Sequence, residues 1–377
     1  DEFVILFENI SDELAAATMA QRISELFTKP FSVGENEILI KANMGIAFFP
    51  SDGNDPKTLI KHANMAMLRA KEDAKNNYHF FRAEIQEEIT GRIEMESNMR
   101  KAIDNGEFFV EYQPLVDAKT EKIIGAEALV RWNHPKLQII PPLDFIPVAE
   151  DTGMILEIGE IVLKSAIAQM QAWHAAGYDD LKISVNISGI QLLQSDLEET
   201  IDAILQKTGF DPRYLQLELT ESTLMQNIEL AAERLEHFKA KQIQISIDDF
   251  GTGYSSLSYL KRLPIDSLKI DQSFIRNIQS DESDKVIVDT IIAMGHNLGL
   301  EVVAEGIEQP AQKHYLQQHA CDILQGYLFG KSLDAEAFGA LLRGEYTLRP
   351  DTAGSDEEAY EIEQALRKYS KPLKISF

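Results

Sequence analysis

The chain has 377 residues, of which 44% are hydrophobic, and a formal net charge of -25. Its composition is that of an ordinary soluble globular protein, and its length exceeds the size at which a single core usually stops growing, so we expect two domains. The negative charge argues against binding to DNA, RNA or an anionic membrane surface, because proteins bind these partners through clusters of Lys and Arg.

The cysteine count and the hydropathy of the chain exclude further classes of protein. Cys321 is the only cysteine, which excludes an intrachain disulfide and any zinc site built on several thiolates. No stretch approaches the roughly 20 apolar residues of a membrane span, and no signal peptide opens the chain. We expect a cytoplasmic protein. Because the chain starts abruptly at Asp1, an upstream membrane anchor or sensor in a longer protein is compatible with this expectation.

Residues 1–81 are predicted to form a small α+β segment. The runs DEFVILF and EILIKANMGIAFFP are typical of strands, and helices are expected over Asp12 to Phe27 and Pro56 to Asp73. Residues 82–104 have apolar side chains near helical spacing and predict one long helix. This helix could connect two domains or belong wholly to the core of the next one.

Residues 105–343 alternate β-rich runs with longer amphipathic segments. The predicted strands are FFVEYQP, IIGAEALVRW, LKISVNIS, YLQLELTES, QIQISIDDF, IDSLKIDQ, EVVAEGIE and DILQGYLFG. The predicted helices between them include Leu156 to Ala175, Asp196 to Gln206, Ile228 to Lys239, Ser283 to Leu298 and Gln309 to His319. Eight strands with interposed helices predict a TIM-like (β/α)8 barrel with its site at the carboxyl ends of the strands. The alternative is an open doubly wound sheet, but no GxGxxG follows the early strands.

Residues 344–377 are predicted to form a tail. Ser355 and Glu358 have the spacing of a capping box at the start of a short helix. The tail could dock on the barrel or on a partner, or it could be a poorly ordered terminus.

Polar residues share one face of the predicted barrel strands. In LKISVNIS, Ile183 and Val185 alternate with Ser184 and Asn186, so the apolar pair would face the helices and the polar pair the barrel interior. This alternation of faces along a strand, called strand parity below, places the following polar residues toward the barrel interior: Glu127, Asn186, Glu218, Asp248, Lys269 and Glu305. Asp249 can join this set because the chain is expected to curl out of the strand there.

Carboxylates gathered at one barrel mouth would repel one another, and a divalent cation is the economical explanation for such a set. Oxygen ligands with one Asn amide, and no clustered His or Cys, suit Mg²⁺ or Mn²⁺ better than Zn²⁺. Any one of these acids alone would be interpreted as a solvated surface residue. Two oxygen-bound ions about 4 Å apart are the usual arrangement for hydrolysing a phosphodiester. Lys269 could position or deprotonate the attacking water, or serve as a structural counter-ion.

The same region carries eight ordered motifs, YQPLVD, EALVRW, VNIS, ELTES, DDFGTGYSS, LKID, AEGIE and QGY. They resemble the EAL-domain family of cyclic di-GMP phosphodiesterases, roughly from Met95 to Arg343. The resemblance implies two metal ions bound by Glu127, Asn186, Glu218, Asp248, Asp249 and Glu305, with Asp249 serving the second ion. It implies catalytic roles for Lys269, Glu305 and Glu127. It further implies that Gln325 holds the site together, that Leu129 and Arg131 contact the substrate, and that Glu221 anchors the loop after Asp249.

The N-terminal segment resembles the second half of a GGDEF (diguanylate cyclase) domain, through DEF at its start and ANMAMLRAKEDAKNN further on. The two glycines of that family's motif, and the half that supplies its first metal and nucleotide ligands, are not in this sequence. We therefore expect that residues 1–81 do not make cyclic di-GMP.

The resemblance implies hydrolysis of cyclic di-GMP to linear pGpG by a homodimer that requires Mg²⁺ or Mn²⁺ and is inhibited by Ca²⁺. Inactive family members usually lose a motif residue, so the intact set here favours catalysis. A catalytically silent cyclic di-GMP receptor, or a scaffold that signals through the helix at residues 82–104, is the alternative. Ser332 stands where many members have proline; we expect it to lie away from the predicted ligands and to change little.

Overall fold

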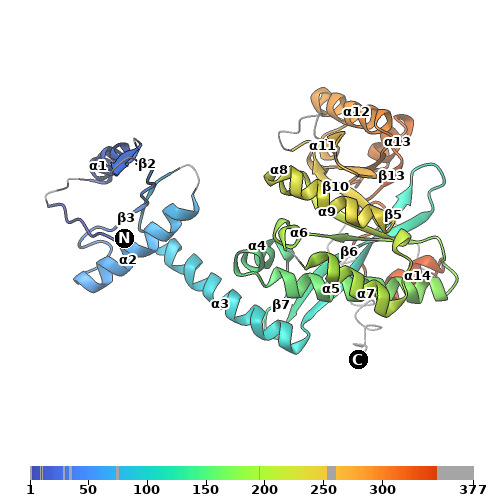
Figure 1. Ribbon diagram of the computed structural model, residues 1–377, viewed down its shortest axis with the longest axis horizontal. Coiled ribbons are helices and arrows are strands. Elements are labelled where there is room, and N and C mark those ends of the chain that lie inside the picture. The colour runs from blue at the N-terminus through green and yellow to red at the C-terminus, as the bar shows by residue number, and fades with distance from the viewer. Residues whose placement is uncertain are drawn as a thin grey trace. The chain divides into compact units, whose positions relative to one another are not determined.

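The computed structural model describes residues 2–8, 10, 12–28, 30–33, 36–73, 76–194, 196–252 and 260–345. It divides into two compact units, residues 1–98 and 99–377, and the division falls within helix α3 (Ala83–Asn105) (Figure 1). No helix in the described part is long and apolar enough to cross a membrane. The predicted tail helix at Ser355 lies outside the described residues.

The first unit contains two capped helices and two small sheets. Helices α1 (Glu13–Leu26) and α2 (Pro56–Glu72) begin after Asp12 and Asp55, whose carboxylates accept the N–H groups of the first turns. Strands β1 (Phe31–Val33) and β2 (Asn36–Ile38) pair antiparallel, whereas β3 (Met44–Ile46) and β4 (Tyr78–Phe80) pair parallel. Both predicted helices are present; α1 is one residue shorter than predicted at each end, and α2 begins as predicted and ends one residue earlier.

The predicted strand DEFVILF is wrong for its described residues 2–7, which are irregular in the structure. The side chains of Phe3 and Leu6 are 90% and 84% exposed, and no strand in the described part pairs with this run. Strand propensity reflects the packing of side chains on a sheet, so an apolar run without a neighbour does not form a strand. The second predicted run, EILIKANMGIAFFP, holds parts of two short strands, β2 and β3, in place of one.

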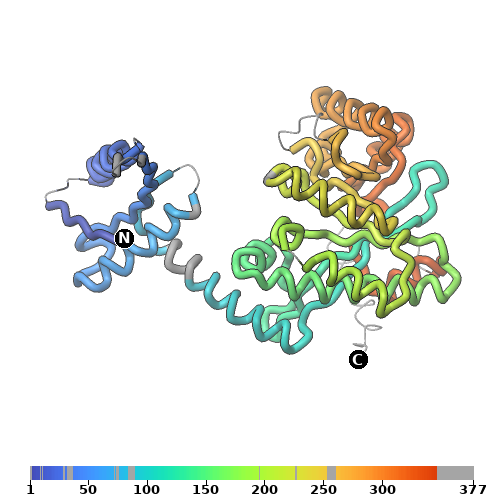
Figure 2. Tube along the Cα trace, in the orientation of Figure 1, coloured from blue at the N-terminus to red at the C-terminus, as the bar shows by residue number. Residues whose placement is uncertain are grey.

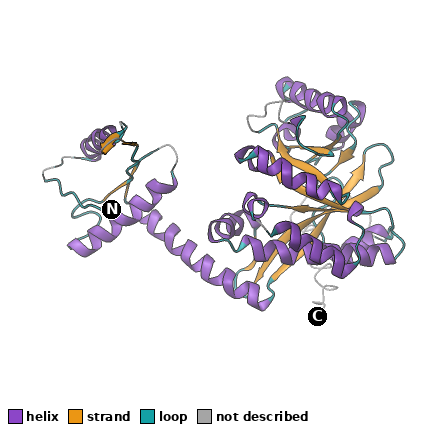
Figure 3. Ribbon diagram, viewed as in Figure 1, coloured by secondary structure: helices purple, strands orange, loops and turns teal. Residues whose placement is uncertain are grey.

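The second unit is built around a closed barrel of eight strands within the described residues (Figure 3). Its strands are β5 (Phe108–Asp117), β6 (Ile123–His134), β8 (Lys182–Asn186), β9 (Leu215–Thr220), β10 (Gln244–Phe250), β11 (Ser267–Ile270), β12 (Glu301–Ala304) and β13 (Ile323–Leu324). Pairing runs in the order β5-β13-β12-β11-β10-β9-β8-β6, and β6 closes the ring by pairing with β5. A short strand, β7 (Gln138–Ile140), extends the outer edge of β6. The predicted barrel is confirmed.

One strand of the barrel runs against the others. β5 is antiparallel to both of its neighbours, β6 and β13, while the remaining neighbouring pairs are parallel. The connection from β5 to β6 is a five-residue turn, in which the carboxylate of Asp117 accepts the backbone N–H of Thr120 at 2.6 Å. Such a short turn can join only antiparallel strands, so the first strand has no crossover helix.

Helices cover the outside of the barrel, and the tube in Figure 2 follows their alternation with the strands. They are α4 (Pro142–Thr152), α5 (Ile155–Ala175), α6 (Gly189–Leu193), α7 (Leu197–Thr208), α8 (Glu221–Gln226), α9 (Ile228–Ala240), α11 (Gln272–Arg276), α12 (Glu282–Asn297), α13 (Pro310–Gln318) and α14 (Ala335–Leu342), with a 3₁₀ turn at Pro212–Tyr214. α5 buries Ile158, Leu163 and Ile167 and packs against β5 and β8. The barrel strands contribute Ile183, Leu217 and further apolar residues, which are almost wholly buried. The main core therefore lies between strands and helices, as the strand parity predicts.

Candidate active site

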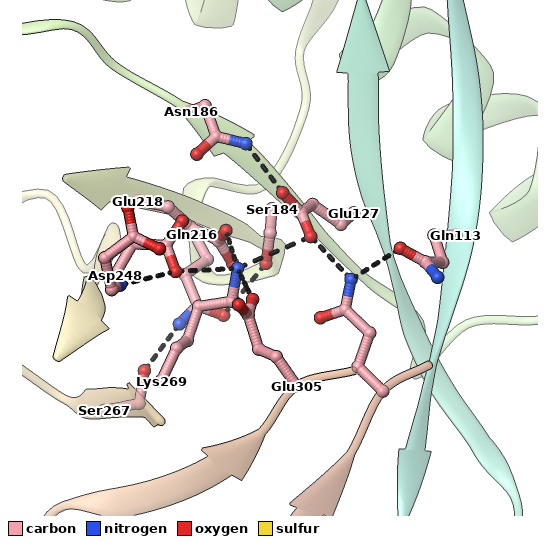
Figure 4. A network of polar contacts seen from close by, with 12 residues as sticks. Gln113, Glu127, Ser184, Asn186, Gln216, Glu218, Asp248, Ser267, Lys269 and Glu305 are labelled. Atoms are coloured by element: carbon pink, nitrogen blue, oxygen red, sulfur yellow. Dashed lines mark hydrogen bonds and ion pairs between the residues drawn. The ribbon is translucent and has the colours of Figure 1, made fainter. Parts of the chain in front are cut away.

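Six of the barrel strands contribute a polar side chain to one cluster, as Figure 4 shows. Five of these side chains lie near or just beyond the carboxyl end of their strand, whereas Glu127 lies within the long strand β6. Glu127, Asn186, Glu218, Asp248 and Lys269 come from β6, β8, β9, β10 and β11, and Glu305 follows β12. The register of the sheet brings Asn186 beside Glu218. Several of these residues line an open cleft of about 400 Å³. The polar set selected by parity is therefore brought together at one end of the barrel.

Lys269 lies among four carboxylates and is 1% exposed. Its ammonium is 2.6 Å from a carboxylate oxygen of Glu218 and 2.6 Å from one of Glu305. The corresponding distances to Asp248 and Glu127 are 3.3 Å and 3.4 Å. Burial alone would lower the pKa of Lys269, but these carboxylates raise that pKa well above its ordinary value. The four carboxylates therefore favour the charged form of the Lys269 side chain.

The carboxylates outnumber this one cation, and their pKa values reflect the excess. Burial raises the pKa of Glu218 well above its ordinary value, despite the attraction of Lys269. Burial likewise raises the pKa of Glu305 to about 8. For Glu127, burial acts in the same direction, but Lys269 and hydrogen bonds from Gln325 and the Asn186 amide outweigh it and hold the pKa below its ordinary value. The site therefore has a deficit of positive charge.

Asp249 leaves the strand at an irregularity in β10. The pairing of β10 with β11 shifts register between Ile247 and Phe250, and Asp249 has φ of 53°, in the left-handed region. Its backbone N–H donates to the Asp248 carboxylate at 3.0 Å. Burial, with the nearby carboxylates of Asp248 and Asp271, raises the pKa of Asp249 to about 6. The chain curls out of the strand here, as expected from the sequence.

Two groups of acidic residues in the described part could each hold a metal ion. The first is Glu127, Glu218 and Asp248, and the second is Asp248, Asp249 and Glu305; within each group the ligand oxygens lie within 4.8 Å of one another. Asp248 belongs to both groups and would therefore be a ligand shared by them if each held an ion. Oxygen donors, together with the raised pKa values, fit hard divalent cations.

A layer of amides fixes the orientation of Glu127. Asn186 donates its amide to one carboxylate oxygen at 2.7 Å, and Gln325 donates to the other at 2.6 Å. The same Gln325 amide donates to the side-chain oxygen of Gln113 at 3.0 Å, and Gln113 donates to the carbonyl of Gly330 at 3.2 Å. Gln325 therefore ties Glu127 to β5 and to the segment that follows β13. The organising role that the family resemblance implies for Gln325 stays a prediction.

The two predicted substrate contacts lie further along β6 on the same face as Glu127. Leu129 is half-buried, and neither Leu129 nor Arg131 belongs to the residues that line the cleft. Arg131 donates to the carboxylate of Glu111 and, from Nη2, to the hydroxyl of Ser332, both at 2.8 Å. Among the described hydrogen bonds Ser332 contacts none of the predicted metal ligands, but it contacts Arg131, a predicted substrate residue. Whether it changes little stays a prediction.

Glu221 lies beneath the start of the loop that follows Asp249. It is 2% exposed, and one carboxylate oxygen accepts the backbone N–H of Gly251 at 3.1 Å. Gly251 has φ of 101°, a conformation that favours glycine. The contact is the one expected of a loop anchor. Residues 253–259 lie outside the described part of the chain.

Several residues of the cleft carried no predicted role. Gln113, Gln272, Arg276 and Tyr327 line it together with the predicted carboxylates. Gln113 and Tyr327 belong to the motifs YQPLVD and QGY, and parity along β5 could have selected Gln113. Tyr327 is 59% exposed, and the Lys331 ammonium lies 5.6 Å from its ring centroid. No sequence pattern marks Gln272 and Arg276, which reach the cleft because α11 follows β11 directly.

Two family models match the chain. The model described as EAL domain matches residues 96–332, and the model described as diguanylate cyclase, GGDEF domain matches residues 1–77. Together they account for both compact units of the structure.

Curated relatives match most of the chain. It is 40% identical over 336 residues to the bifunctional diguanylate cyclase/cyclic di-GMP phosphodiesterase MucR of Pseudomonas aeruginosa, covering 89% of this chain and 49% of the relative. It is 37% identical over 338 residues to the cyclic di-GMP phosphodiesterase PdeR of Escherichia coli, covering 90% of this chain and 51% of the relative. The chain thus spans about half the length of these relatives.

Solved structures give the same result for the fold. The PaMucR phosphodiesterase in complex with c-di-GMP superposes with a TM-score of 0.64 at 43% identity, covering 65% of this chain and 99% of the other. The EAL enzyme Bd1971, in a form with cAMP and cyclic di-GMP bound, superposes with a TM-score of 0.65 at 33% identity, covering 78% and 77%.

Proposed function

This chain belongs to the EAL-domain family, and we propose that its barrel hydrolyses one phosphodiester bond of cyclic di-GMP to give linear pGpG. The observation that carries the proposal is the pair of acidic groups that share Asp248 at the barrel mouth. The names of the relatives MucR and PdeR, and the cyclic di-GMP complex of PaMucR, support the choice of substrate.

Two Mg²⁺ or Mn²⁺ ions fit the donor set best. Glu127, Glu218 and Asp248, with the amide oxygen of Asn186, would hold the first ion, and Asp248, Asp249 and Glu305 the second. Bound there, the ions would supply activated water and stabilise the charge on the attacking and leaving oxygens. We expect Ca²⁺ to inhibit, because it accepts longer and less regular coordination than Mg²⁺.

The reaction joins a water oxygen to phosphorus, breaks the bond from phosphorus to one ribose oxygen, and returns a proton to that oxygen. Glu305 lines the cleft and is 2.6 Å from Lys269, so the two residues are placed to orient the attacking water. Of the roles considered for Lys269, positioning is favoured over proton removal, because its raised pKa keeps the ammonium protonated. Glu127 contributes as a ligand whose two oxygens are already aligned.

Substrate recognition would use the cleft and, beyond the residues that line it, the part of β6 that carries Leu129 and Arg131. Arg131 offers a guanidinium to a phosphate, Leu129 an apolar contact, and Gln325 an amide that also aligns Glu127. Arg276 and Tyr327 add a cation and an exposed aromatic ring on the cleft wall.

We further propose a homodimer formed through the barrel unit, in which the loop anchored by Glu221 links the dimer contact to Asp249. The Glu221 contact with Gly251 supports this role. In this account residues 1–81 form a GGDEF-like segment, residues 82–104 a connecting helix, residues 105–343 the phosphodiesterase barrel and residues 344–377 a tail.

The test is product formation. The protein, incubated with cyclic di-GMP and Mg²⁺ or Mn²⁺, should give pGpG in a chromatographic assay, and Glu127→Ala should lower turnover by about a hundredfold or more. Glu160→Ala on the outer face of α5 is the matched control and should retain activity, since Glu160 pairs only with Lys164 among the described contacts. Tight binding without pGpG would favour the receptor alternative.

A further inference from the structure

Arg131, Glu111 and Ser332 form a closed triangle of hydrogen bonds. Arg131 Nε donates to Glu111 Oε2 at 2.8 Å, and Arg131 Nη2 donates to Ser332 Oγ at 2.8 Å. Ser332 Oγ in turn donates to the same Glu111 oxygen at 2.7 Å. The side chains of Arg131 and Glu111 are 17% and 19% exposed, so water screens this ion pair only in part.

The backbone around Ser332 is held in place. Its neighbour Leu333 exchanges both backbone hydrogen bonds with Tyr112 on β5, at 2.7 Å and 2.9 Å. Two residues before Ser332, the carbonyl of Gly330 accepts the Gln113 amide. Ser332 therefore stands at a fixed position beside β5, and its hydroxyl acts as a fixed acceptor for Arg131.

These contacts restrict how the guanidinium can turn. Nη1 donates to the carbonyl of Val130 at 2.9 Å, so three of the five N–H groups of Arg131 have partners among the described residues. Each terminal nitrogen keeps one further N–H, and these two donors remain for a phosphate, which a guanidinium can bind bidentately. Without the Ser332 hydroxyl, Nη2 loses its acceptor, and the guanidinium can rotate about its remaining contacts.

We propose that Ser332 is a positioning residue, which together with Glu111 orients Arg131 toward a phosphate of the substrate. The inference rests on the proposed function, because it requires a phosphodiester ligand at the barrel mouth. A proline at this position could neither accept nor donate these hydrogen bonds, because its side chain has no polar atom. The orientation of Arg131 thus depends on the Ser332 hydroxyl.

The test compares Ser332→Ala with Ser332→Thr, using kcat, KM and the Kd for cyclic di-GMP measured by calorimetry with Ca²⁺. Ser332→Ala should raise KM and Kd by about three- to tenfold, because a hydrogen bond to a charged group is lost, and leave kcat within about twofold. Ser332→Thr, which keeps the hydroxyl, should restore both constants. Ser280→Ala is the control; its hydroxyl bonds only a local carbonyl in the described part, and it should match the wild type.

A double-mutant cycle with Arg131→Ala gives the decisive comparison. Ser332→Ala should have no further effect on KM or Kd once Arg131 is removed. Equal effects in the two backgrounds would overturn the inference, as would unchanged constants in Ser332→Ala alone. If the wild type binds cyclic di-GMP without hydrolysing it, the proposed function fails, and the Kd values still decide the inference. A wild type that binds no cyclic di-GMP overturns both.

Discussion

At the scale of single residues, Lys269 determines the charge balance of the site. It is the only Lys or Arg within 4.0 Å of Glu218, Asp248 and Glu305 among the described ion pairs. Removing one partner from a buried ion pair is costly, because the remaining charges stay buried without compensation. The cluster therefore holds more carboxylates than cations among the described residues, and Lys269 supplies only one positive charge.

Replacement of Lys269 tests this charge balance. In Lys269→Met, a change of similar side-chain length, we expect the unfolding free energy of the metal-free protein to fall by about 3–5 kcal/mol. Mg²⁺ should restore part of this loss, and turnover should be abolished. Urea unfolding with and without Mg²⁺ measures both effects. Lys164→Met on α5, which removes only an exposed pair with Glu160, should unfold like the wild type. A Lys269→Met protein as stable as the control would contradict the account.

The raised pKa values of Glu305 and Asp249, about 8 and about 6, predict how stability changes with pH. A carboxyl group whose pKa is higher in the folded protein binds its proton more tightly there. It therefore stabilises the fold below its unfolded value, and this stability is lost as the pH rises through the folded value. For Glu305 the window runs from its ordinary value of 4.5 to about 8.

Metal-free protein should accordingly lose at least about 1 kcal/mol of unfolding free energy between pH 5 and 9. With saturating Mg²⁺ the trend should reverse, because metal ions bind the deprotonated carboxylates. Urea unfolding in EDTA and in Mg²⁺ across this range measures both slopes. A metal-free protein whose stability rises with pH would show that the acids are not held in their protonated form.

At the scale of elements, the irregularity in β10 affects the two adjacent acids Asp248 and Asp249. Regular strand alternation would place their side chains on opposite faces of the sheet. The register shift after Ile247 and the positive φ of Asp249 allow both Asp248 and Asp249 to join metal-binding groups. The role of Asp249 therefore depends on backbone geometry as much as on its charge.

Asp249→Asn isolates the charge, because Asn also tolerates a positive φ. We expect turnover to fall by about a hundredfold, while the Kd for cyclic di-GMP changes by less than about threefold. Calorimetry and the pGpG assay give the two values. Asp271→Asn is the comparison, since Asp271 is near Asp249 but belongs to neither acidic group. Equal losses of turnover and binding in Asp249→Asn would count against its assignment to the second ion.

Strand parity explains how much of the site could be predicted from the sequence. The alternation of faces is a property of each strand alone. It therefore predicted Glu127, Glu218 and Lys269 as site residues before their arrangement in space was known. The antiparallel direction of β5 was not predicted, because the strands were matched to a regular barrel in which all strands are parallel. The short turn at Asp117 indicates this direction in the sequence. Arg276 could not be selected, because a residue beyond a strand reaches the cleft only through the path of its own helix.

The contacts of Ser332 show a second limit of prediction from the sequence. The departure from proline was visible, but its consequence depends on Arg131 and Glu111, which lie about 200 residues away in the chain. Only the closed barrel, in which β13 pairs with β5, brings these residues together. Conversely, the apolar run at residues 2–7 fits a strand in isolation, and it is irregular because the described structure offers it no partner.

At the scale of the whole molecule, the two units differ in what they can support. The barrel closes on itself and gathers its acids at one mouth, whereas the described part of the first unit has two small sheets and exposes Phe3, Leu6 and Phe49. We therefore assign the proposed chemistry to the barrel, within the predicted bounds of residues 105–343. The formal charge of -25 fits a ligand whose phosphates are bound through metal ions and a few local cations such as Arg131.

The most direct measurement of the central claim is the rate of pGpG formation from cyclic di-GMP across a titration of Mg²⁺ or Mn²⁺. We predict no product in EDTA, a rate that rises with metal along a curve steeper than one-site binding, and suppression by added Ca²⁺. Formation of pGpG at full rate in EDTA, or no pGpG at any metal concentration despite tight binding of cyclic di-GMP, would contradict a two-metal phosphodiesterase.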